Sequence, residues 1–106
     1  MDEIAIVIAD TTGVIHFWSK GAERAFGHAA EKAVGQTLDL IVPAEFREAH
    51  WRGFYRAMAA GSAAAEGLAN EFPVLGAGGG IRATPGKLAL LRAEGDRVIG
   101  AMVIFE

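Results

Sequence analysis

The stretch DTTGVIHFWSKGAERAFG, residues 10–27, carries the clearest local signals in this chain of 106 residues. Its first four residues are turn formers, and a β-branched run at residues 4–9 precedes them. Residues 14–18 return to strand-forming types, so the two runs predict an antiparallel hairpin. Ser19 is a favourable helix N-cap, and apolar residues then recur at helical spacing until Gly27. We therefore expect a short helix directly after the second strand.

The rest of the chain predicts a helical middle followed by three strands. A short helical stretch fits residues 29–34, and an apolar turn fits residues 37–41. Residues 44–60 lie between Pro43 and Gly61 without an internal proline, which predicts the one long helix. Strands are expected at residues 68–75, 81–92 and 97–105, with turns at 76–80 and 93–96. This order predicts an α+β fold, a five-stranded antiparallel sheet with helices over one face, in a single domain spanning residues 1–106.

The composition excludes several classes of protein. Hydrophobic residues make up 52% of the chain and charged residues 22%, which suits a packed core. The net charge of -3 provides no cationic surface for nucleic acid. Apolar runs are far shorter than a membrane span, and Asp2 and Glu3 replace the positive start of a signal peptide, so we expect a cytoplasmic protein. The absence of cysteine excludes disulfides, thiolate metal sites and cysteine-dependent chromophores.

The sequence shows no enzyme signature. No serine lies in a nucleophile elbow, and the carboxylates Glu45, Glu48, Glu66 and Glu71 show only surface spacing. The glycine-rich residues 76–80 lack the Lys-Ser/Thr pair of a phosphate loop, so they are expected to form a turn. These features give no indication of a hydrolase or phosphate-binding site, and we do not expect an enzyme.

The stretch at residues 10–28 resembles the opening of a PAS domain, whose usual pattern is D-x-x-G-x-I-x-x-x-N-x-x-A-E-x-x-F-G-Y. Ser19 stands where asparagine is commonest in that family, and His28 stands where tyrosine is commonest. The resemblance continues through residues 38–43. It implies the same order of strands and helices that the residues themselves predict.

Residues 43–56 resemble the long helix of the oxygen-sensing haem-PAS kinases of the FixL type. In that family a proline opens the helix, a histidine seven residues later binds haem iron, and an arginine six residues further on contacts a haem propionate. Pro43, His50 and Arg56 match both spacings without gaps. The resemblance therefore implies noncovalent haem b with His50 as the iron ligand.

The spacing within the long helix is consistent with a ligand on its inner side. At about 100° per residue, Phe46, His50, Gly53, Phe54 and Ala57 share one face. His50 is therefore expected to point toward the sheet with the apolar side chains. Gly53, one turn on, leaves space beside the imidazole for a flat macrocycle.

The far side of the expected pocket follows from alignment with the same family. Leu88 and Leu90 are two residues apart, so they share one face of a strand, and the alignment puts them on the distal, gas-binding side. Counting places Asn70 where the family has the arginine that stabilises bound oxygen, and an asparagine would donate a weaker hydrogen bond. His16, flanked by Ile15 and Phe17, is expected to face opposite to both. Neither His16 nor His28 is expected to be a ligand.

Together these expectations describe a gas-sensing PAS domain that binds haem b. The implied cofactor-binding residues are His50, Arg56, Gly53, Phe54, Leu88, Leu90 and Asn70, with His50 on the iron. Oxygen, carbon monoxide or nitric oxide would bind at the open iron position, with incidental peroxidase-like activity. The signal would pass to a homodimer partner, through the sheet face or the N-terminal segment, or to an output domain outside this chain. The alternative is a haem-free PAS module that dimerises or binds a small apolar or acidic metabolite.

Overall fold

β1 (Ala5–Asp10) and β2 (Ile15–Trp18) form the predicted hairpin in the computed structural model, which describes residues 3–106. The Asp10 carboxylate organises the turn. Its Oδ1 accepts hydrogen bonds from the backbone N–H groups of Thr12 and Val14, at 2.9 and 3.1 Å, and from the Thr12 hydroxyl at 2.7 Å. The Thr12 hydroxyl bond is the largest of the contacts that hold the pKa of Asp10 well below its usual value.

A β-bulge in this hairpin corrects one expectation. Ile8 pairs with Phe17 and Ala9 pairs with Ile15, so His16 is the extra residue between two pairs. Because a bulge breaks the alternation of side chains, His16 and Phe17 are both exposed while Ile15 is fully buried. His16 therefore does not face opposite to Phe17, and both side chains are exposed. Its Nε2 lies 2.7 Å from Asp10 Oδ2.

The two short helices begin and end close to their predicted positions. α1 (Lys20–Phe26) starts after Ser19, whose Oγ accepts hydrogen bonds from the N–H groups of Ala22 and Ile6 at 3.1 and 2.8 Å. It ends at Gly27, which has a left-handed φ of 85°. α2 (Ala30–Ala33) follows, and the 3-10 turn η1 (Leu38–Leu40) occupies the predicted apolar turn.

The long helix begins one turn later than the sequence predicts. Residues Ala44–Phe46 form a 3-10 turn, η2, and the α-helix α3 spans Arg47–Ala60. The Phe46 N–H donates to the Pro43 carbonyl at 2.9 Å, an i to i+3 bond that tightens this first turn. Gly61 closes the helix in a left-handed conformation, as expected.

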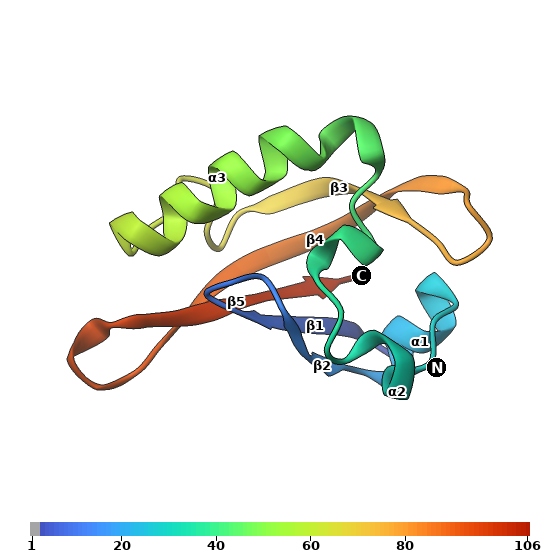
Figure 1. Cartoon of the computed structure of the whole chain (residues 1–106), viewed down its shortest axis with the longest axis horizontal. Helices are drawn as coiled ribbons and strands as arrows, with labels where there is room; N and C mark the ends of the chain where they lie inside the picture. The colour runs from blue at the N-terminus through green and yellow to red at the C-terminus, as the bar shows by residue number, and fades with distance from the viewer. Residues whose placement is uncertain (1–2) are drawn as a thin grey trace.

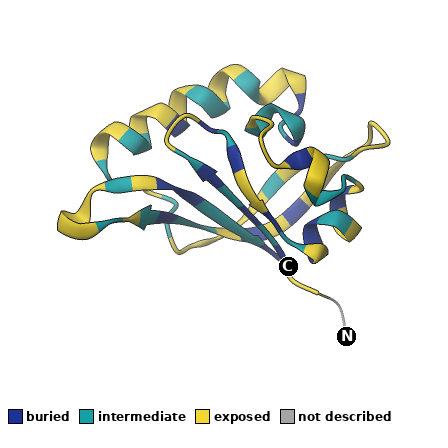
Figure 2. Cartoon of the chain, turned by 60° about the horizontal axis from the view of Figure 1, so that its bottom comes forward, coloured by how far each residue is buried: buried dark blue, intermediate teal, exposed yellow. Residues whose placement is uncertain are grey.

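The remaining strands complete a single antiparallel sheet in the order β2-β1-β5-β4-β3. β3 (Ala69–Leu75) and β4 (Ile81–Arg92) are joined by the predicted glycine-rich turn, and the 3-10 turn η3 (Glu94–Asp96) leads into β5 (Val98–Phe105). The helices pack over one face of this sheet, as predicted (Figure 1). α3 lies across that face, while α1 and α2 lie near β1 and β2 (Figure 1, Figure 2).

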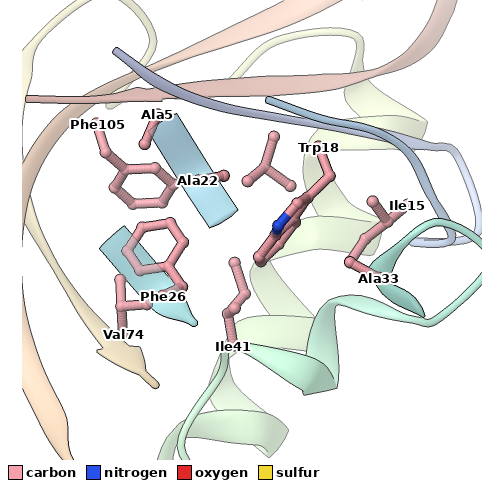
Figure 3. Close-up of a cluster of buried hydrophobic side chains, with 10 residues drawn as sticks. Ala5, Ile15, Trp18, Ala22, Phe26, Ala33, Ile41, Val74 and Phe105 are labelled. Carbon is pink, nitrogen blue, oxygen red and sulfur yellow. The ribbon is translucent and has the colours of Figure 1, made fainter. Parts of the chain in front are cut away.

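The buried side chains divide into two clusters. The first packs Trp18, Phe26 and Phe105 with Ile15 and Val74 (Figure 3). Trp18 and Phe26 meet edge to face with ring centroids 5.8 Å apart. The second cluster is smaller and lies under α3, around Phe54, Leu90 and Ala101. Within residues 3–106, no helix is long and apolar enough to cross a membrane.

Glu66 ties the segment between α3 and β3 to β4. The Glu66 carboxylate accepts a hydrogen bond from the Leu90 N–H at 2.9 Å and forms a two-pronged ion pair with Arg92, at 3.1 Å for each oxygen. Arg92 also donates to the Gly61 carbonyl at 3.0 Å. These contacts hold the segment against the sheet beside the second cluster.

Candidate functional site

A cavity of about 460 Å³ lies between α3 and the sheet, next to the second cluster. Its size falls in the range of ligand pockets, which is roughly 300 to 1,000 Å³. The helix α3 contributes three small residues beside His50, Phe54 and Met58, and the strands contribute mostly aliphatic and aromatic residues. The residues that line it are Val7, Ala9, Leu38, Ile41, Val42, Phe46, Ala49, His50, Gly53, Phe54, Ala57, Met58, Ala63, Phe72, Pro73, Val74, Leu88, Leu90, Ala101, Val103 and Phe105.

His50 is the only lining residue whose side chain carries a nitrogen or an oxygen atom. Its Nδ1 is buried and has no hydrogen-bond partner among residues 3–106. Burial lowers the pKa of His50 below its usual 6.5, and the nearby negative charge of Asp39 opposes this shift. The shift favours the uncharged imidazole, in which one ring nitrogen keeps a free lone pair, as a metal ligand requires.

Two aromatic rings of α3 pack against the imidazole. The Trp51 ring meets the His50 ring edge to face, with centroids 4.9 Å apart at 75°. Phe54 also stacks near His50, with centroids 5.9 Å apart at 28°, and it meets the Trp51 ring edge to face at 5.4 Å. These contacts restrict the orientation of the imidazole at the edge of the cavity.

A polar network that the sequence did not indicate anchors Trp51. Its indole Nε1–H donates to Asp39 Oδ1 at 2.7 Å, which joins α3 to η1. Arg47 donates to the backbone carbonyl of Asp39 at 3.3 Å, and its Nε lies 3.7 Å from Asp39 Oδ1. On the side of the hairpin, the Trp51 ring occupies the space that a side chain at Gly13 would need. Asp39 and Gly13 therefore set the position of the ring that contacts His50.

Five of the seven predicted cofactor-binding residues line the cavity: His50, Gly53, Phe54, Leu88 and Leu90. The predicted face of the long helix is correct, because Phe46 and Ala57 also line the cavity. At Gly53 the space is open, since a Cβ built there would meet no heavy atom of residues 3–106 within 4 Å. The structure thus brings the predicted imidazole, the predicted gap and the two leucines to one cavity.

Arg56 and Asn70 lie outside the cavity lining. Arg56 is exposed on α3, and no carboxylate of residues 3–106 forms an ion pair with it. Asn70 is exposed in β3, where its Oδ1 accepts a hydrogen bond from the Glu71 N–H at 2.9 Å. The contacts with haem expected for these two residues remain predictions.

The residues present fit a haem in three respects. The cavity is apolar, the neutral form of the one imidazole on its wall is favoured, and Gly53 leaves room against the helix. In the part of the chain that the structure describes, no three His, Asp or Glu side chains gather into a cluster that could hold a metal ion. An iron at this site would therefore take one protein ligand, His50, with the macrocycle filling the apolar space.

Comparison with known proteins identifies the family. A family model described as the PAS fold matches residues 2–106. An uncharacterized protein of Azorhizobium caulinodans is 32% identical over 102 residues, which cover 93% of this chain and 14% of that protein. The chain thus spans 14% of the length of this relative.

Solved structures with the same fold cover nearly the whole chain. The PAS domain of a protein from Colwellia psychrerythraea has a TM-score of 0.81 and 24% identity, over 97% of this chain and 84% of that one. The PAS domain of the Cronobacter turicensis quorum-sensing receptor RpfR, in complex with C12:0, has a TM-score of 0.75 and 18% identity, over 96% of this chain and 90% of that one. At these identities the likeness shows the fold alone. With the family match over residues 2–106, the chain belongs to the PAS fold family.

Proposed function

We propose that this PAS domain binds haem b through His50 and senses a diatomic gas. PAS domains are generally sensor or binding modules, and the cavity gives this one a place for a ligand. One observation carries the proposal: His50 is the only side chain with a lone-pair nitrogen on the wall of an otherwise apolar cavity of about 460 Å³. Burial lowers the pKa of that imidazole and so favours its neutral form, which coordination of a metal requires.

Each part of the cavity wall would have a separate task. His50 would hold the iron, and the small residues Ala49, Gly53 and Ala57 would let a flat ring approach α3 closely. Leu88 and Leu90, from β4, would exclude water from the far side. When bound, haem b supplies an iron with an open coordination position for oxygen, carbon monoxide or nitric oxide. Arg56 is exposed one residue before the cavity-lining Ala57, and in this proposal its guanidinium pairs with a propionate at the rim.

The output of such a sensor would lie outside these residues. The outer face of the sheet carries the paired residues Ile6 with Ile104 and Ile8 with Met102, all partly exposed. This apolar row supports the proposal of a homodimer or a partner protein that receives the signal. Size-exclusion chromatography with light scattering measures the oligomeric state directly, and a strictly monomeric chain with and without haem would exclude the homodimer.

An absorption experiment tests haem binding. The chain is produced with added haem precursor, purified and titrated with haem, and a Soret band of one haem per chain is expected. His50→Ala should abolish or shift this band, because it removes the proposed iron ligand. His16→Ala is the matched control, because His16 is exposed on β2 and does not line the cavity. Two outcomes would contradict the proposal. One is a wild-type chain that shows no Soret band after titration with haem, and the other is a His50→Ala variant whose Soret band is the same as that of the wild type.

A second candidate is a haem-free domain that binds a small apolar molecule. It is favoured by the absence of a charged side chain from the cavity lining and by the similar fold that was solved in complex with C12:0. Thermal shift and calorimetry with C12:0 would test it. A saturable rise in Tm that Gly53→Phe abolishes, in protein without a Soret band, would favour this candidate over haem.

A further inference from the structure

We propose that Trp51 and Tyr55 form an electron-transfer route from the edge of the cavity to the surface of α3, with Asp39 as the proton acceptor for Trp51. The route carries the oxidising equivalent of a small radical away from His50 and the interior of the cavity. It lies on the part of α3 outside the cavity lining, and it works without haem or any other bound ligand.

Three rings of α3 lead outward from the cavity in consecutive contacts. His50 lines the cavity, and the Trp51 ring meets its imidazole edge to face with centroids 4.9 Å apart. Trp51 in turn stacks on Tyr55, four positions along the helix, with centroids 5.5 Å apart and an angle of 24° between the ring planes. Tyr55 is 53% exposed. Because electron transfer between aromatic side chains is fastest when their rings are in contact, this stack joins the cavity edge to a ring that faces solvent.

Trp51 has a proton acceptor that favours its oxidation by one electron. An indole that has lost an electron is a much stronger acid than the neutral indole, so a nearby base stabilises the oxidised state. The Nε1–H of Trp51 donates to Asp39 Oδ1 at 2.7 Å. The carboxylate can take this proton, and its negative charge favours a positive charge on the ring. Asp39 therefore makes Trp51 easier to oxidise than an indole without such a partner.

Trp18 provides a comparison within the same chain. Its Nε1–H donates to the backbone carbonyl of His28 at 2.9 Å, and a carbonyl is too weak a base to take the proton. Its ring meets Phe26 and His28, with centroid distances of 5.8 and 6.1 Å. The one tyrosine of the chain is Tyr55, which stacks on Trp51. Among the described residues, Trp51 alone combines a carboxylate acceptor with a stacked phenol.

The two steps of the route balance in electrons and protons. A small oxidising radical takes one electron from Trp51 and becomes its anion, while the indole proton moves to Asp39. Trp51 then regains an electron from Tyr55 and its proton from Asp39, and the phenolic proton of Tyr55 passes to solvent. The net result is a reduced oxidant, an unchanged tryptophan and a tyrosyl radical at the surface, where soluble reductants can reach it.

Pulse radiolysis of the chain without cofactor tests the route, with the azide radical as the one-electron oxidant of tryptophan. The Trp18→Phe variant leaves Trp51 as the one tryptophan beside the one tyrosine. After the pulse, the absorption of the tryptophan radical should decay while that of the tyrosyl radical rises, at a first-order rate that does not depend on protein concentration. Asp39→Asn should prolong the radical cation of Trp51, which absorbs at longer wavelength than the neutral radical, because an amide cannot take the proton.

Trp51→Phe is the matched control, because it keeps Trp18 in the first cluster as the one tryptophan. This variant should lose the first-order rise of the tyrosyl radical, whereas Trp18→Phe should keep the rate of the wild type. Either variant compared with the wild type decides the question, so the test stands if one of them does not fold. Tyr55→Phe removes only an exposed hydroxyl group and should lengthen the lifetime of the tryptophan radical.

Three results would overturn the inference. They are a tyrosyl rise that is equally fast in Trp51→Phe, a rise whose rate grows with protein concentration, and a radical cation that is equally short-lived in Asp39→Asn. The first two show that the electron does not pass from Trp51 to Tyr55 within one chain, and the third removes Asp39 as the proton acceptor. The measurement needs no haem, so a chain without a Soret band would refute the proposed function and leave this inference standing.

Discussion

Replacing Gly53 with alanine should stabilise the domain without its ligand. Gly53 lies inside α3, and its φ is not in the left-handed region. A Cβ built at this position meets no heavy atom of residues 3–106 within 4 Å, so the added methyl group causes no steric conflict. In a helix interior, alanine is more favourable than glycine by about 1 kcal/mol. The free energy of unfolding should therefore rise by about that amount.

Equilibrium unfolding in urea measures this change, and the same experiment shows whether the slope of the transition stays constant. In a thermal melt, about 1 kcal/mol corresponds to roughly 4–8 °C for a domain of about this size. Gly61→Ala is the matched control at the end of the same helix. A Cβ there would make only an ordinary contact, 3.7 Å from Val98 Cγ2, but Gly61 has a φ of 73°. The control should therefore lose about 1–2 kcal/mol through backbone strain alone.

The two substitutions should change the free energy of unfolding in opposite directions, with a rise for Gly53→Ala and a fall for Gly61→Ala. If Gly53→Ala destabilises the chain by 1 kcal/mol or more, the space beside His50 is not open, and the argument for a flat ligand against α3 fails with it.

Three further changes test the surroundings of His50. Gly13→Ala should destabilise the domain by at least about 2 kcal/mol, because Gly13 has a φ of 82° and the Trp51 ring occupies the space of the added Cβ. The midpoint urea concentration of unfolding should be clearly lower for this variant than for the wild type; an unchanged midpoint would contradict the prediction. His50→Phe should gain stability relative to the wild type as the pH falls from about 7.5 to 5.5. Burial lowers the pKa of His50 in the folded chain, so the unfolded chain binds more protons in this range and the wild type alone loses stability; a stability difference that does not change with pH would contradict this. Asp39→Asn should lower the pKa of His50 further, because it removes the negative charge that opposes the effect of burial; an NMR titration of the imidazole that shows a rise would refute that role for Asp39.

The sequence was sufficient for the order of elements and for most of their limits, because these depend on local signals. Ser19, Gly27 and Gly61 act within one helical turn of their own position, as cap or terminator, and all three do so in the structure. The inner face of α3 was predictable for a related reason, since helical geometry alone places His50 beside Phe46, Gly53 and Phe54.

Features that depend on distant contacts were not predictable. The bulge at His16 depends on the register between two strands, and no residue type in the strand signals it. Glu66 contacts Leu90 and Arg92, which are 24 and 26 positions away in the sequence. Because no local pattern indicates such distant partners, the sequence alone predicted only an exposed carboxylate. The bond from Trp51 to Asp39 spans 12 positions and joins two elements whose packing is set by the whole fold.

The positions taken from family resemblance agree with the structure unevenly. His50 lies on a helix, and Leu88 and Leu90 lie on a strand. Within such regular elements the spacing of residues determines which face each side chain occupies, and all three residues line the cavity. Asn70 was placed by counting residues across the irregular segment at residues 61–68. This chain and the FixL-type domains can differ in length there. Asn70 is exposed near the start of β3, and its contact with a bound ligand stays a prediction.

The two tryptophans give this domain a built-in optical readout. Trp51 touches the His50 ring at a centroid distance of 4.9 Å, whereas Trp18 lies in the first cluster against Phe26. The emission of Trp51 should therefore be quenched by energy transfer to any absorbing ligand held at His50. In a Trp18→Phe variant, Trp51 would be the single tryptophan, and occupancy of the cavity could be followed by selectively excited tryptophan fluorescence in a chain that carries no added dye.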